Sequence, residues 1–198
     1  MKNINNKGQG LVELIVAIAV IEIGIFAVWS LFLVNFNAER EAETRIVGVD
    51  LAREGIEAIK NIRDSNWLKN GSNFLTMPDA KIWSWDQNLT AGEYAINYDS
   101  LIPDSADYAD IYLNGDGFYN DAQIGQKTIY RRIVTLQDIC CLDSDDNSQC
   151  DNTEYSIVGR MQGCELKIGI NVVSRVAWQI SGRSRQAIVE DNLYNWKQ

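Results

Sequence analysis

Five oxygen-bearing side chains in the last third of the chain have the spacing of a calcium-binding loop. They are Asp143, Asp145, Asn147, Asp151 and Glu154. Counted from the first, they occupy positions one, three, five, nine and twelve, which are oxygen-ligand positions of an EF-hand. Ser148 stands where that loop needs glycine, and the flanks do not indicate paired helices. Two hypotheses follow: a calcium site, or an acidic solvated loop tethered by a disulfide.

The chain has four cysteines, all in the same region: Cys140, Cys141, Cys150 and Cys164. In an exported domain such cysteines form disulfides. A bond between the adjacent Cys140 and Cys141 is geometrically poor, which leaves two connectivities, in which each of them pairs with Cys150 or Cys164. A zinc site is the rival interpretation, but the chain has no histidine and no Cys-x-x-Cys motif.

Composition argues against catalysis and against nucleic-acid binding. Histidine, the commonest general base and metal ligand, is absent. The formal net charge is −9, which disfavours capture of nucleic acid. Four arginines could still form a basic patch, although solvated strand faces explain them as well: Arg131, Arg132, Arg183 and Arg185.

Two smaller groups have both a functional and a structural interpretation. Trp83 and Trp85 would share one face of a strand, where they could stack on a sugar, grip a partner or pack in the core. Asn114, Asp116 and Asn120 could bind calcium, but a hairpin turn explains them without a metal. We favour core packing for the tryptophans and the turn for the polar cluster.

An apolar stretch from Leu11 to Phe36, which we call the apolar segment, contains only two charges, Glu13 and Glu22. As a helix its 26 residues would be about 39 Å long, enough to cross a hydrocarbon core of about 30 Å. A carboxylate inside such a span is costly, so each one requires a partner or a task.

The flanks of the apolar segment predict its orientation. The leader contains Lys2 and Lys7 and no acid, whereas residues 37–45 mix acids with arginines. The positive-inside rule then places the N-terminus in the cytoplasm. No small-residue cleavage site of the secretory type ends the stretch, so we expect the apolar segment to stay with the mature protein.

A basic leader ending in Gly8, a glutamate five residues later and an unbroken hydrophobic helix resemble the class III signal of type IV prepilins and type II secretion pseudopilins. The resemblance implies that prepilin peptidase cuts between Gly8 and Gln9 and that Gln9 is the methylated residue. The family usually has phenylalanine at the position of Gln9, and threonine or serine at that of Gly10. Glu13 would then pair with the N-terminal amine of a neighbouring subunit during filament assembly.

Helical periodicity continues beyond Phe36 through apolar residues three and four positions apart: Ile46, Val49, Ala52, Ile56, Ile59 and Ile62. We therefore expect one helix from about Leu11 to about Arg63, apolar on all sides in its first half and amphipathic in its second. Three glycines within it, Gly24, Gly48 and Gly55, allow bending or close packing, although harmless surface or packing positions explain them as well.

The rest of the chain predicts an antiparallel sheet. Residues 66–107 read as a connecting loop with a first strand at Tyr94 to Tyr98, and a hairpin follows around residues 114–117. Lys127 to Leu136 is a strand candidate. From Leu166 to Ile180 apolar residues share even parity, which predicts a long strand with one buried face, and the turn at residues 181–184 returns the chain.

The predicted fold is α+β and pilin-like: a long N-terminal helix packed on a C-terminal antiparallel sheet. We expect a cleaved leader at residues 1–8, a transmembrane and assembly part at 9–36, an amphipathic helix at 37–65 and a β-rich globular domain with disulfides at 66–198. The sequences Trp178-Gln-Ile-Ser-Gly-Arg183 and Leu193-Tyr-Asn-Trp196 resemble the C-terminal hairpin of minor pilins.

The resemblance implies a noncatalytic subunit, a minor pilin or pseudopilin, of a type IV pilus or type II secretion pseudopilus. It would sit in the bacterial cytoplasmic membrane as a single pass and then enter an extracellular or periplasmic filament. Its partners would be prepilin peptidase, other pilin subunits, a membrane platform protein, an assembly ATPase and, before assembly, lipid.

Two alternatives from other classes stay open. One is a membrane-anchored extracellular adhesion protein with a calcium-dependent β domain, which would keep its surface display after Glu13→Ala. The other is an anchored hydrolase, which would need a deep polar cleft.

Overall fold

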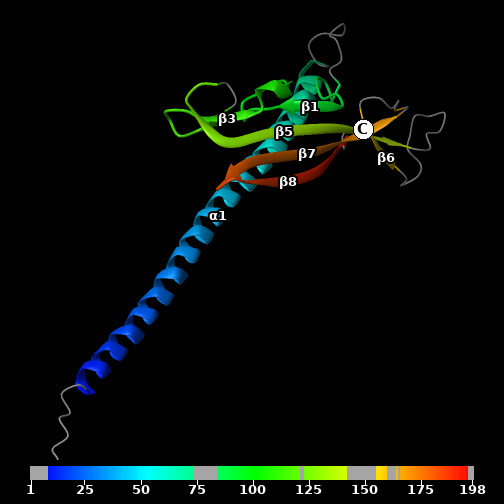
Figure 1. Ribbon diagram of the computed structural model, residues 1–198. Coiled ribbons are helices and arrows are strands. Elements are labelled where there is room, and N and C mark those ends of the chain that lie inside the picture. The colour runs from blue at the N-terminus through cyan, green and yellow to red at the C-terminus, as the bar shows by residue number, and fades with distance from the viewer. Residues whose placement is uncertain are drawn as a thin grey trace, which may run out of the picture. The chain divides into compact units, whose positions relative to one another are not determined.

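A computed structural model of the chain describes residues 9–73, 84–120, 123–141, 155–159, 164 and 166–195. The chain divides into two units, Met1–Thr44 and Arg45–Gln198. We call the second unit the head. In chain order the elements are α1 (Gln9–Asn73), β1 (Gly92–Ala95), β2 (Asp104–Ser105), the 3-10 helix η2 (Ala106–Tyr108), β3 (Asp110–Leu113), β4 (Tyr119–Asn120), β5 (Gln126–Cys141), β6 (Tyr155–Val158), β7 (Lys167–Ile180) and β8 (Arg183–Tyr194). Figure 1 labels α1, β1, β3 and β5 to β8.

Helix α1 confirms the predicted long helix and extends it at the C-terminal end. The expectation that irregular structure begins at Asn66 is wrong, because α1 continues through Asn73. Tertiary contacts hold Asn66, the first residue of this extension, in the helix. The Asn66 amide donates hydrogen bonds to the carbonyls of Trp85 and Gln87, at 3.2 and 2.9 Å. These bonds fix a residue type that otherwise favours turns.

Strand β5 organises an antiparallel sheet to which all the described strands belong. Along one edge, β5 pairs in turn with β3, β1 and β6, and along the other edge it pairs with β7. Strand β8 then pairs with β7 over its whole length (Figure 1). The fold class α+β is therefore confirmed. The predicted strand from Lys127 to Leu136 corresponds to β5, which continues to Cys141.

The predicted final hairpin is present and closes with a two-residue turn. Ile180 pairs with Arg183, so only Ser181 and Gly182 lie between the strands. Both have positive φ, 49° and 74°, as the type I′ turns of two-residue hairpins require. The expected hairpin around residues 114–117 is also present, since β3 and β4 pair across it.

The head core lies between the Arg45–Asn73 part of α1 and one face of the sheet. Ile56, Ile59 and Ile62 pack with residues of β5, β7 and β8, and a second cluster joins Leu51 to Trp178. Even-numbered residues of β7 supply the buried face, as their alternation predicts. The close packing expected of the helix glycines occurs at Gly48, where an added Cβ would lie 2.6 Å from the Trp178 ring.

The disulfide expectation is confirmed at the end of β5. Cys140 is bonded to Cys164, Cys141 is also disulfide-bonded, and none of the described cysteines is free. The Cys140–Cys164 bond belongs to one of the two connectivities left open by the sequence. Cys150 lies outside the described residues.

Candidate membrane-spanning segment and polar sites of the head

The apolar segment exposes its side chains on all sides. Its large apolar residues range from 41% exposed at Phe36 to 76% at Phe26. The segment belongs to the first unit, and no residue of its most apolar window is buried. A buried core helix would be covered, whereas a helix that meets lipid or other helices would not. The helix is long and apolar enough to cross a membrane.

Both carboxylates of the apolar segment are exposed on this helix. Glu13 and Glu22 are nine residues apart, so at about 100° per residue they lie on opposite faces. Neither forms an ion pair with any residue that the structure describes. Gln9 is the first residue of α1, while Gly8 lies outside the described residues.

A stripe of rings follows the C-terminal part of the apolar segment. Trp29 and Phe32 have ring centroids 6.1 Å apart, and Phe32 and Phe36 are stacked at 6.3 Å. The Arg40 guanidinium lies over the Phe36 ring, 4.3 Å from its centroid. A helix that places aromatic rings next to its first cation is typical of a membrane–water interface.

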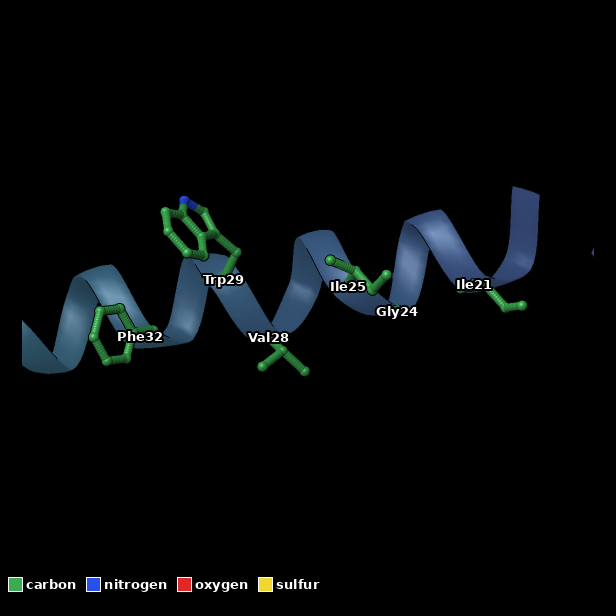
Figure 2. Close-up of a pocket in the computed structure, with 6 residues that line it drawn as sticks. All are labelled: Ile21, Gly24, Ile25, Val28, Trp29 and Phe32. Atoms are coloured by element: carbon green, nitrogen blue, oxygen red, sulfur yellow. The ribbon is translucent and has the colours of Figure 1, made fainter. Parts of the chain in front are cut away.

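A shallow apolar depression lies on the same helix around Gly24. It is lined by Ile21, Gly24, Ile25, Val28, Trp29 and Phe32, none of which is charged. Figure 2 shows these side chains spread along the helix, with Gly24 leaving a gap between the larger ones. An added Cβ at Gly24 would meet nothing within 4 Å. Gly24 therefore differs from Gly48, because nothing described packs against it.

The predicted calcium ligands Asp143, Asp145, Asn147, Asp151 and Glu154 lie outside the described residues. Among the described residues, no group of three or more His, Cys, Asp or Glu could hold a metal. In the second polar cluster, the Asn114 side chain accepts hydrogen bonds from the amides of Asp116 and Phe118, at 3.1 and 2.8 Å. The Asn114 side chain therefore stabilises the turn, as the hairpin interpretation predicts.

The four arginines do not form one patch. Arg131 and Arg132 are neighbours in β5 and so point to opposite faces of the sheet. Arg132 is buried, and its guanidinium donates to the carbonyls of Leu51 and Ile96 and to the Glu54 carboxylate at 3.0 Å. This contact ties α1 to the sheet. The sequence contained a signal for it, because Arg132 occupies an inward position between Tyr130 and Val134.

Besides the contacts of Arg132, a cluster of charged side chains surrounds Lys167. It was not predicted from the sequence. Its ammonium lies 2.9 Å from Asp86 and 2.8 Å from Asp138, and donates to the Leu89 carbonyl at 3.1 Å. Burial opposes ionisation of the Asp86 carboxyl, but hydrogen bonds from Ser84 and Lys167 outweigh it and lower the pKa of Asp86.

The core interpretation of Trp85 is confirmed. Its side chain packs against the larger core cluster of the head. The Lys167 ammonium lies 5.7 Å from the centroid of the Trp85 ring. Trp83 lies outside the described residues.

Comparison of the chain with family models, with curated proteins and with solved structures finds no match.

Proposed function

We propose that this chain is a noncatalytic structural subunit of a type IV pilus or of a related type II secretion pseudopilus. The observation that carries the proposal is the place of Glu13. This carboxylate follows Gly8 by five residues and lies near the start of an apolar helix that nothing described covers. The same helix α1 then continues into a part that packs on an antiparallel sheet.

The proposed path begins with insertion into the cytoplasmic membrane. The lysines of the leader stay on the cytoplasmic side, and the apolar segment spans the bilayer. Trp29, Phe32 and Phe36 with Arg40 then mark the far interface, where rings and a long cationic side chain are favourable. The disulfide Cys140–Cys164 suits a head on the oxidising side of the membrane.

Processing supplies the partner that Glu13 requires. Prepilin peptidase cuts after Gly8 and leaves a free amine on Gln9, which the enzyme methylates. In the filament this amine pairs with Glu13 of a neighbouring subunit. Two opposite charges brought together in a low-dielectric interior cost far less than either charge alone. The pairing also fixes the axial register between subunits.

Assembly then exchanges lipid for neighbouring helices. The exposed side chains of the apolar segment lose little in this exchange, because lipid tails and packed apolar side chains are similar environments. A membrane platform protein and an assembly ATPase supply the work. Loss of Lys2 and Lys7 changes the formal charge from −9 to −11, so the mature subunit is strongly acidic. The loop with Asp143, Asp145, Asn147, Asp151 and Glu154 is a candidate calcium site of the exported head.

The test is the intact mass of the membrane-extracted protein with and without coexpressed prepilin peptidase. We expect the peptidase to remove the mass of residues 1–8 and to leave Gln9 as the first residue, with the mass of one methyl group added by methylation of its amine. Gly8→Leu is the matched control, since it changes only the last leader residue and should block the loss. If the wild-type mass is unchanged by the peptidase, the pilin proposal is wrong.

A further inference from the structure

Glu22 is a carboxylate that the proposed function leaves without a task. It lies near the middle of the apolar segment, where an ionised side chain is costlier than near either end. In the proposed filament, Glu13 pairs with the N-terminal amine that leader cleavage creates. That amine is therefore not available to Glu22. Glu22 forms no ion pair with the described residues, and it remains exposed on the helix.

The surface next to Glu22 is hollowed. A depression separate from the one at Gly24 is lined by Glu22, Ile23, Phe26, Ala27 and Ser30. The Ser30 hydroxyl donates its hydrogen to the Ala27 carbonyl at 2.9 Å, so it does not neutralise the carboxylate. The small side chains of Ala27 and Ser30 leave room for a side chain of a neighbouring helix. A carboxylate at the rim of such a depression suits a long cationic side chain.

The neighbour at Glu22 differs from the neighbour at Glu13. Because the two carboxylates lie on opposite faces of the helix, one packed helix cannot contact both. Each filament subunit has several neighbours in a bundle of helices, so the two faces meet different ones.

In the register that pairs Glu13 with Gln9, a second copy of this chain brings no lysine or arginine to Glu22. Residues 9–39 contain no lysine or arginine, and the first cation after them is Arg40. Arg40 follows Glu22 by 18 residues, which is about 27 Å along a helix. The register that pairs Glu13 with the amine of Gln9 shifts two copies by only four residues, or about 6 Å. A copy packed at another register brings Arg40 to the depth of Glu22 only at a shift of about 27 Å, which leaves only about 12 Å of the two apolar segments side by side. A different polypeptide with a cation at that depth needs no such shift.

We infer that Glu22 is the contact for a second kind of subunit, whose membrane-spanning helix carries a lysine or arginine at the depth of Glu22. The inference rests on the proposed function and deepens it. It makes this chain a member of a mixed complex of pilin-like helices and disfavours a filament built from this chain alone. Glu22 then selects the partner, because a helix without a cation leaves the carboxylate unpaired in lipid.

The experiment uses a charge-reversed copy of the full chain as the surrogate partner. Two differently tagged copies are expressed in one bacterial membrane with prepilin peptidase, and the share of one copy recovered with the other is measured after extraction in mild detergent. We expect wild type to pair with Glu22→Lys at least about tenfold more than with wild type. Glu22→Gln in place of wild type should abolish this preference. Glu22→Arg serves as the cationic copy if Glu22→Lys fails to insert.

Val20→Lys is the matched control. It places the same charge at nearly the same depth but almost on the opposite face, since two residues turn a helix by about 200°. Equal pairing of wild type with Val20→Lys and with Glu22→Lys would overturn the inference. Self-pairing of wild type that Glu22→Gln weakens would also overturn it, because the contact would then join like copies.

Leader cleavage is measured in the same samples. Cleaved variants without a pairing preference count against the Glu22 contact alone, whereas absent cleavage counts against the proposed function.

Discussion

Two stretches of helix α1 share the same helical backbone conformation but differ in the burial of their side chains. In the head, Leu51, Ile56 and Ile59 are between 0% and 3% exposed, because the sheet covers one face of the helix. In the apolar segment no large apolar side chain is less than 41% exposed. Hydrogen bonds within a helix satisfy the backbone in both places. The side chains therefore determine whether a stretch is stable against the sheet of the head or in contact with lipid or other helices.

This contrast separates two sources of stability. Burial of an isoleucine in the head contributes about 1.5 to 3 kcal/mol within the folded chain itself. The apolar segment gains a similar amount only from lipid or from other helices, since the described chain does not cover it. Substitutions in the head should therefore change the free energy of unfolding of one chain. Substitutions in the apolar segment should change insertion or assembly instead.

The largest effect on the head is expected from Arg132→Ala. It would leave the carbonyls of Leu51 and Ile96 without their buried donor and would remove the partner of Glu54. Breaking a buried ion pair costs about 3 to 5 kcal/mol, and because Glu54 is partly exposed we expect about 3 kcal/mol. The measurement is urea unfolding of the full chain in detergent, followed by tryptophan fluorescence.

Arg131→Ala is the control for that variant. Arg131 is the adjacent residue of β5 but is exposed on the other face, so its loss should change the free energy of unfolding by no more than about 0.5 kcal/mol. Similar losses for the two variants would show that Arg132 does not hold α1 to the sheet.

A smaller effect is expected from adding a methyl group at the helix glycines. At Gly48 the new Cβ would clash with the buried Trp178 ring, which costs about 1 to 3 kcal/mol, while the better helix propensity of alanine returns about 1 kcal/mol. Gly48→Ala should therefore destabilise the head by about 1 kcal/mol. Gly24→Ala, which meets nothing within 4 Å, should leave unfolding of the head unchanged. Destabilisation by both would contradict the contrast between the two stretches.

The parts of the fold that repeat a simple period could be predicted from the sequence. Alternation along β7 and the three- and four-residue steps of α1 from Ala52 to Ile62 reflect a buried face, so local pattern and tertiary burial agree there. They disagree at Ile46, which is 63% exposed, and at Asn171, which is buried on the other face of β7. The end of α1 could not be found in this way. Asn66 and residues 70–73 are of turn-forming types, and hydrogen bonds from Asn66 to residues 85 and 87 hold the first of them in the helix.

The polar sites were harder to predict for the same reason. Alternation could place Arg132 on the inner face, but its partners come from α1 and from the residue after β1, more than 30 positions away. The Lys167 cluster likewise joins residues from three separate stretches. The cysteine spacing left two connectivities open, because Cys140 and Cys141 can each pair with either of the two later cysteines. Only the path of the folded chain distinguishes them.

The smallest effect is expected from pH, and it tests whether the Lys167 cluster stabilises the head. The pKa of Asp86 is lowered in the folded chain, so its contribution is fully present above the unfolded pKa, near 3.8, and is lost as the pH falls through the folded pKa. Between pH 5 and pH 2 wild type should lose more of its free energy of unfolding than Asp86→Asn, which has no such carboxyl to titrate. Thermal unfolding of both proteins across this range measures the difference. Parallel curves would mean that Asp86 is ionised equally easily in the folded and unfolded chains, and that the contact with Lys167 adds nothing to the stability that the core already provides.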